Sequence, residues 1–178
     1  MPHPSLTTKT QRHKESRGTK TLVGVISDTH GLLRPEVLSA FKGVSLILHA
    51  GDIGNTDVLN GLLTLAPVVA VRGNNDRGEW AKGISEFETV RIGAVSIYML
   101  HDLKEMNEKA TTEKFRVVIS RHSHRPCIDE RKGVLFLNPG SAGPRRFTLP
   151  ISVALLVVEG RVVHAELIDL SVGNRKTG

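Results

Sequence analysis

The sequence has one cysteine, few aromatic side chains and no long hydrophobic run. The lone Cys127 excludes an internal disulfide and any metal cluster held by several thiolates. Aromatic residues make up 4% of the 178 residues, so Leu, Val, Ile and Ala must fill the core. The longest apolar stretch, residues 153–158, is far shorter than the ~20 residues that cross a bilayer. We therefore expect one domain in a reducing, cytoplasmic compartment, with no membrane contact.

The positive charge is concentrated at the N-terminus. Of the net charge of +6, residues 1–20 carry +4, from five basic side chains and one acidic one, which leaves +2 for the rest. No specific nucleic-acid partner is expected, because the body of the chain lacks a basic excess. We expect a disordered basic tail over 1–20, a folded domain over 21–172 and a flexible tail over 173–178. Residues 1–20 have no apolar stretch that could serve as a secretory signal. The sequence leaves it open whether the protein forms a homo-oligomer.

Strands and helices alternate in the first half of the chain. The pattern predicts strands over 21–27, 45–50 and 68–72, and helices over 35–41 and 55–65. Pro35 suits the first turn of a helix and Asn55 suits a helix cap. Such alternation predicts a parallel sheet with right-handed crossovers.

The second half is richer in strands. The pattern predicts strands over 86–91, 94–100, 116–120, 128–131, 134–137, 151–158 and 161–170, with one helix within 103–114. These strands are too many for one open sheet in a chain of this size. We therefore expect an α/β fold in which two sheets pack face to face and helices flank them.

Polar clusters stand directly after several predicted strands. They are Asp28-Thr29-His30, Gly51-Asp52, Gly73-Asn74-Asn75-Asp76, His101 and Arg121-His122-Ser123-His124. Because ligands bind outside the carboxyl ends of parallel strands, these side chains should meet at one edge. Their nitrogen and oxygen donors, without sulfur, suit Mn, Fe, Co, Ni or Zn better than Ca or Mg. The candidate metal ligands are Asp28, His30, Asp52, Asn74, His101, His122 and His124, enough for two ions if one carboxylate is shared.

The ordered series DTH, GD, GNND, H, RHSH and NPGS resembles a known family. The calcineurin-like metallophosphoesterases carry DxH, GD, GN[HC]D, HG and GHxH in this order. The chain looks most like the small, single-domain YfcE-type phosphodiesterases, over residues 21 to about 170. The resemblance implies a four-layer α/β/β/α sandwich of two mixed β-sheets flanked by helices.

The resemblance also implies a dinuclear metal centre. One metal would be held by Asp28, His30, Asp52 and His124, and the other by Asp52, Asn74, His101 and His122, with Asp52 as the bridge. The metals would be two divalent transition-metal ions, manganese first, with nickel, cobalt, iron or zinc as alternatives. The catalytic assignments are Asp52, Asn74 and Asp76.

The implied function is that of a metal-dependent phosphoric ester hydrolase acting on a small phosphoester. Two metal ions can lower the pKa of a bridging water, and the resulting hydroxide attacks phosphorus. Two dications and two carboxylates leave a net positive charge, which a hydroxide and a singly charged diester would cancel. A doubly charged monoester would exceed it, so phosphodiesters are favoured. The alternative is a non-catalytic, metal-binding interaction scaffold, as in the retromer subunit on this fold. Because all seven ligand positions keep a competent donor, the enzyme is favoured.

Three positions depart from the family pattern. Asn75 stands where many relatives have histidine, and Asp102 and Arg121 stand where glycine is usual. Asn75 and Arg121 are candidates for substrate binding, although for Arg121 a solvent-directed side chain is the favoured interpretation. Asp102 could be a further ligand, could crowd the second metal or could point away.

Two further residues carry structural expectations. His49, near the end of a predicted strand, is expected to be hydrogen-bonded there or to support a metal ligand. Cys127 is expected to be a small core residue.

Overall fold

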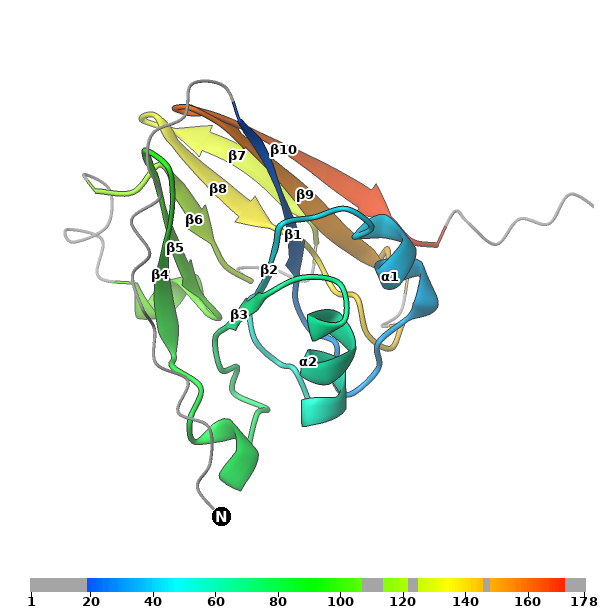
Figure 1. Ribbon diagram of the computed structural model, residues 1–178. Helices are drawn as coiled ribbons and strands as arrows, with labels where there is room; N and C mark the ends of the chain where they lie inside the picture. The colour runs from blue at the N-terminus through cyan, green and yellow to red at the C-terminus, as the bar shows by residue number, and fades with distance from the viewer. Residues whose placement is uncertain (1–18, 107–113, 122–124, 146–147, 172–178) are drawn as a thin grey trace, which may run out of the picture.

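The computed structural model describes residues 19–106, 114–121, 125–145 and 148–171 (Figure 1). The strands are β1 (Lys20–Ile26), β2 (Leu46–His49), β3 (Val68–Ala70), β4 (Phe87–Ile92), β5 (Val95–Leu100), β6 (Val117–Ile119), β7 (Cys127–Arg131), β8 (Val134–Asn138), β9 (Ser152–Glu159) and β10 (Val162–Asp169). The helices are α1 (Pro35–Ala40) and α2 (Thr56–Leu63), with short 3-10 helices η1 (Glu79–Ala81) and η2 (Leu103–Glu105). The predicted α/β fold with two mixed sheets is confirmed.

Each sheet has five strands, and three neighbouring strands in each are parallel. The first sheet has the order β10-β9-β1-β2-β3, with β1, β2 and β3 parallel. The second has the order β4-β5-β6-β8-β7, with β5, β6 and β8 parallel. The remaining pairs are antiparallel and include the β4–β5 and β9–β10 hairpins, at the turns expected from the sequence.

Three hydrophobic clusters define the layers. The largest joins the facing sides of the two sheets, with Val25 of β1 and Ile97 of β5 among its buried members. A second lies between the first sheet and the helices α1 and α2, which sit together on that sheet (Figure 1). A third, smaller cluster, with Val118 at its buried centre, covers the outer side of the second sheet, and Leu103 and Met106 pack against it.

The two helices begin where the sequence predicts. Pro35 opens α1, where its missing N–H costs nothing, because the first turn has no intrahelical acceptor for it. Asn55 caps α2, and its Oδ1 accepts a hydrogen bond from the Val58 N–H at 3.2 Å. Phe41, at the end of α1, is fully buried and lies over Gly24 of β1. A Cβ at position 24 would come within 2.9 Å of the ring, so glycine permits this close helix–sheet packing.

One sequence prediction needs correction, and another is tested only in part. Of the helix expected within 103–114, the described residues contain the 3-10 turn η2, after which the backbone at Met106 is extended. Residues 107–113 of that segment lie outside the described residues, so a helix there stays a prediction. Cys127 is exposed rather than in the core, because β7 is the edge strand of the second sheet.

Candidate metal centre

Three predicted metal ligands have an unusual backbone conformation. Asp28, His30 and Asp52 have φ of 54°, 45° and 55°, in the left-handed region that L-residues rarely adopt. Hydrogen bonds between the loops after β1 and β2 hold this conformation. The N–H groups of residues 28, 30 and 31 donate to the carbonyls of residues 51, 52 and 53, at 3.0, 2.9 and 2.8 Å. Backbone strain that the surroundings maintain is typical of functional sites.

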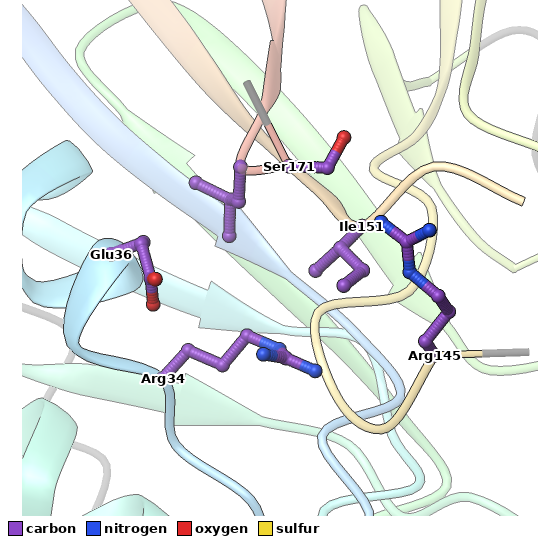
Figure 2. Close-up of a pocket in the computed structure, with 6 residues that line it drawn as sticks. Arg34, Glu36, Arg145, Ile151 and Ser171 are labelled. Atoms are coloured by element: carbon purple, nitrogen blue, oxygen red, sulfur yellow. The ribbon is translucent and has the colours of Figure 1, made fainter. Parts of the chain in front are cut away.

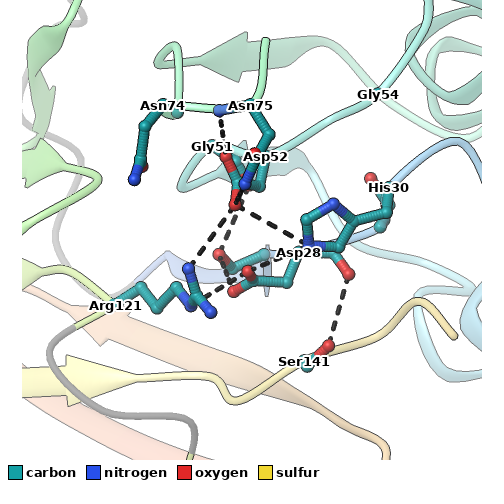
Figure 3. A network of polar contacts seen from close by, with 12 residues as sticks. Asp28, His30, Gly51, Asp52, Gly54, Asn74, Asn75, Arg121 and Ser141 are labelled. Carbon is teal, nitrogen blue, oxygen red and sulfur yellow. Dashed lines mark hydrogen bonds and ion pairs between the residues drawn. The ribbon is translucent and has the colours of Figure 1, made fainter. Parts of the chain in front are cut away.

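The side chains of Asp28, Asp52 and His101 converge, from the carboxyl ends of β1 and β2 in the first sheet and of β5 in the second. All three are buried, and one donor atom from each lies within 4.8 Å of the others. His30 joins them, because its Nε2 is 3.4 Å from Asp28 Oδ1 and 3.7 Å from Asp52 Oδ2 (Figure 3). The structure therefore brings together four of the seven predicted ligands.

The carboxylate of Asp52 faces two groups of donors. Its Oδ2 is directed toward His30, and its Oδ1 lies 3.6 Å from Nε2 of His101. Asn75 contacts both oxygens, through its backbone N–H to Oδ1 at 3.0 Å and its side-chain amide to Oδ2 at 2.7 Å. Burial alone would raise the pKa of Asp52, but the neighbouring His101 ring and two hydrogen bonds from Asn75 hold it well below its ordinary value. The group is therefore a permanent carboxylate.

Asp28 has one oxygen that is engaged by a hydrogen bond and one that is not. Ser27, which the sequence analysis does not single out, donates its hydroxyl to Oδ2 at 2.9 Å. Oδ1 is buried and accepts no hydrogen bond within the described part of the chain, although Arg121 forms an ion pair with it. Burial raises the pKa of Asp28, against the opposing charge of Arg121. A buried carboxylate oxygen with unfilled lone pairs fits a metal ligand.

The orientation of His101 also fits a metal ligand. Its Nδ1 lies 2.7 Å from the carbonyl oxygen of Ala50, so Nδ1 carries the proton and donates it there. The other nitrogen, Nε2, faces Asp52 with a lone pair, which is how metal-bound histidines are commonly held. Burial works against protonation, but Asp52, the Ala50 carbonyl and Asp28 raise the pKa of His101 above its ordinary value. The residues present therefore fit a divalent ion held by nitrogen and oxygen donors.

The loop after β3 closes over Asp52. Asp76 accepts hydrogen bonds from the N–H groups of Gly54 and Gly73, at 2.9 and 2.8 Å, and so ties this loop to the one after β2. Gly73 lies so close to Asp52 that a Cβ there would overlap its Oδ1 and backbone nitrogen. Asn74 is exposed and lines a cavity of about 530 Å³ together with His101 and Asp76. The catalytic roles of Asn74 and Asp76 stay predictions.

His49 is a hydrogen-bonded strand-end histidine, as expected. Its Nδ1 accepts from the Gly51 N–H at 3.2 Å, so the neutral ring carries its proton on Nε2. Nε2 lies 2.9 Å from Oγ1 of Thr29, whose own hydroxyl donates to the carbonyl of Ile53. This chain of bonds joins the loops that carry Asp28 and Asp52. Burial, followed by the charge of His101, lowers the pKa of His49 to about 3.

Arg121 is not directed to solvent, contrary to the favoured interpretation. Its side chain is 14% exposed and reaches between the two carboxylates, with Nε 2.9 Å from Asp28 Oδ1 and Nη1 3.4 Å from Asp52 Oδ2 (Figure 3). His122 and His124 lie outside the described residues, and their ligand roles stay predictions. Asp102 points away from the metal ligands and caps η2, accepting from the Lys104 N–H at 3.0 Å.

The NPGS motif, residues 138–141, and the residues that follow it hold the loop after β1 in place. Gly143 N–H and Ser141 Oγ both donate to the carbonyl of Asp28, at 3.0 and 3.3 Å. Arg34 donates twice to the Gly143 carbonyl, at 3.2 and 3.1 Å. Arg34 also lines a separate cavity of about 220 Å³, together with Glu36, Arg145 and Ile151 (Figure 2).

Comparisons with known proteins agree with this geometry. Residues 22–161 match the model of the calcineurin-like phosphoesterase superfamily domain. The chain is 40% identical to a probable metallophosphoesterase of Methanothermobacter thermautotrophicus, over 83% of this chain and 91% of that one. Within the described residues, no helix has the length and apolar character to cross a membrane.

Solved structures share the fold. An archaeal phosphodiesterase superposes with a TM-score of 0.67 and 25% identity, over 83% of this chain and 100% of that one. Vps29 of Entamoeba histolytica, in complex with Zn²⁺, superposes with a TM-score of 0.65 and 26% identity, over 84% of this chain and 99% of that one. Strained ligand loops, a buried Asp–Asp–His cluster and these matches lead to one conclusion: the chain belongs to the calcineurin-like phosphoesterase superfamily.

Proposed function

We propose that this protein is a phosphodiesterase that uses two divalent transition-metal ions. The observation that carries the proposal is the orientation of Asp52, whose Oδ2 faces His30 while Oδ1 faces His101. A carboxylate with donors on both sides is suited to bridge two cations. Asp28 and His30 would hold one ion, and His101 and Asn74 would contribute to the other, with His124 and His122 as their predicted further ligands. Manganese is the first candidate, with nickel, cobalt, iron and zinc as alternatives.

Bound divalent ions would supply Lewis-acid activation of the phosphoester and of the attacking water. The chain's own residues would orient and position the reaction. Asn75 holds the Asp52 carboxylate from two directions, and the bond from His101 to the Ala50 carbonyl fixes its ring. Asp76 braces the loop that carries Asn74 and Asn75. These contacts keep the donor atoms in place before a ligand arrives.

Two arguments favour a diester over a monoester. Two dications and the carboxylates of Asp28 and Asp52 leave a charge that a hydroxide and a singly charged diester would neutralise, whereas a doubly charged monoester would exceed it. The archaeal structure with the same fold is a phosphodiesterase.

The test combines metal content with substrate choice. The chelator-stripped protein is reloaded with Mn²⁺, Ni²⁺, Co²⁺, Zn²⁺ or Mg²⁺, and bound metal per chain is measured by elemental analysis. Hydrolysis of bis(p-nitrophenyl) phosphate is then compared with that of p-nitrophenyl phosphate. We expect about two ions per chain and a higher kcat/KM for the diester.

The matched variants are Asp52→Asn and Asp57→Asn. Asparagine tolerates the left-handed backbone at position 52, so Asp52→Asn removes the bridging charge with little added strain, and both ions should be lost. Asp57 is exposed in the first turn of α2, and its variant should keep metal and activity. Fewer than one ion per chain after reloading would contradict the dinuclear centre and favour the scaffold alternative.

A further inference from the structure

Arg121 lies among the atoms that a metal ion would use. It follows β6, and its backbone N–H donates to the carbonyl of His101 at 2.9 Å, which fixes the residue beside the end of β5. From there its guanidinium reaches both carboxylates (Figure 3). Its Nη1 also lies 3.5 Å from Nε2 of His101. These contacts involve Asp28, Asp52 and His101, the three members of the buried ligand cluster.

The guanidinium compensates the charge of this cluster. Asp28 and Asp52 are 1% and 0% exposed, and buried carboxylates need a counter-charge. In the described part of the chain, Arg121 is the only permanently charged cation that reaches either of them, because their other ion pairs are to histidines. A cation that lies between two buried carboxylates performs the charge compensation that a divalent ion would otherwise provide.

The compensation by Arg121 is incomplete. Nε is 2.9 Å from Asp28 Oδ1, yet this oxygen accepts no hydrogen bond among the described residues. The contact therefore supplies charge without filling the oxygen's lone pairs, whereas a metal ion would do both. A transition metal binds a carboxylate oxygen at about 2.0–2.2 Å, and a guanidinium in contact with the same oxygens would repel it.

We propose that Arg121 is an internal cation that competes with divalent metal for Asp28 and Asp52, so that the guanidinium must leave before the metal binds. The inference rests on the metal centre of the proposed function and adds a control on its loading. Arg121 weakens the apparent metal affinity of the centre and stabilises the fold when metal is scarce. Metal binding then includes the cost of breaking the two ion pairs.

The test measures metal affinity and stability rather than turnover. The Kd for Mn²⁺ and Zn²⁺ is measured by competition with a coloured chelator for wild type, Arg121→Met and Arg121→Lys. Methionine keeps an unbranched, apolar stem without the charge, and lysine restores a positive charge. The melting temperature of each protein is measured in excess chelator. Arg72→Met is the matched control, because Arg72 lines the same cavity as His101 but pairs with Glu86.

Arg121→Met should bind Mn²⁺ at least about tenfold more tightly than wild type, which corresponds to about 1.4 kcal/mol. Its melting temperature in chelator should fall, and Arg121→Lys should lie between the two in both measurements. Arg72→Met should match wild type.

Equal affinity of wild type and Arg121→Met would overturn the inference while leaving the metal centre intact. So would an equal gain in Arg72→Met, which would indicate general electrostatics instead of competition. A raised KM for the diester in Arg121→Met at unchanged metal affinity would overturn it in favour of a phosphate-binding residue. Absence of metal binding in every protein would overturn the proposed function, and this inference with it.

Discussion

At the scale of single residues, Asn75 directs its amide to the carboxylate of Asp52. Relatives with histidine at this position can protonate the departing oxygen, but an amide does not titrate near neutrality. A general acid typically contributes about 10²–10⁴-fold when the leaving group is poor. We therefore expect fast hydrolysis of aryl diesters, whose leaving group needs little protonation, and slow hydrolysis of alkyl diesters. The measurement is kcat for the two substrate classes.

The matching variant is Asn75→His. This variant should reduce the ratio of kcat on aryl diesters to kcat on alkyl diesters, mainly by raising kcat on the alkyl diesters. Equal rates on both classes in wild type, with chemistry rate-limiting, would mean that another group supplies the proton.

His49 gives a prediction on pH. Its pKa is about 3 in the folded protein against an ordinary 6.5. Between these two pH values His49 is therefore protonated in the unfolded chain but neutral in the folded protein. Its contribution to stability is therefore present at neutral pH and is lost as the pH falls from 6.5 toward 3, by about 1.4 kcal/mol per pH unit. His49→Gln lacks this dependence. The stability difference between wild type and His49→Gln should shrink by about 2 kcal/mol from pH 7 to pH 5.

Urea unfolding at a series of pH values, in the presence of chelator, measures this difference. His164→Gln, at an exposed position of β10, is the control and should follow wild type across the range. A constant difference between wild type and His49→Gln would show that His49 takes up its proton in both states alike.

At the scale of elements, the loop after β3 is expected to tolerate no side chain at position 73. A Cβ on Gly73 would overlap Asp52, so Gly73→Ala must displace that carboxylate. We expect a loss of about 1–3 kcal/mol of unfolding free energy and a weakened metal centre. Gly83→Ala is the control, because a Cβ there has nothing within 4 Å and should change stability by no more than about 0.5 kcal/mol.

Chemical denaturation and metal titration of the two glycine variants make the measurement. If Gly73→Ala were as stable and as well loaded as Gly83→Ala, Asp52 would have more freedom than its hydrogen bonds indicate.

The elements that were predictable are those with strong local signals. Apolar strands such as β1 and a capped helix such as α2 are encoded within a few residues, and the polar residues that follow parallel strands then meet by topology. The start of the segment after Asp102 was less predictable. Its charge and helix-forming residues suggest a helix, but residues 103–105 form a 3-10 turn, and Met106 is extended and packs against the outer cluster of the second sheet.

The direction of the Arg121 side chain shows a second limit. An arginine after a strand is most often solvated, and no local pattern indicates otherwise. Its inward position depends on two carboxylates brought in from other strands, Asp28 and Asp52. The participation of Ser27 depends in the same way on the orientation that the fold gives to Asp28.

At the scale of the whole molecule, the N-terminal segment is expected to be dispensable. Residues 1–18 contain Lys9, Arg12, Lys14 and Arg17 against Glu15, so their removal lowers the net charge from +6 to +3. The segment has no apolar stretch with which to dock, and β1 begins at Lys20. The truncated protein should keep the melting temperature and turnover of the full chain and should elute earlier from heparin. A marked drop in melting temperature would show that the segment packs on the body.

The bonds between the loops after β1 and β2 have a consequence for cooperativity. Those loops continue the parallel pairing of their strands for several residues, in a backbone conformation that few residues accept. The metal ligands therefore belong to the same folding unit as the central sheet rather than to a surface segment that opens on its own. We therefore expect Asp28 and Asp52 to be released together, in an opening that also disturbs β1 and β2. A remote core mutation that speeds global unfolding should then shorten the time for which this pair of carboxylates stays assembled.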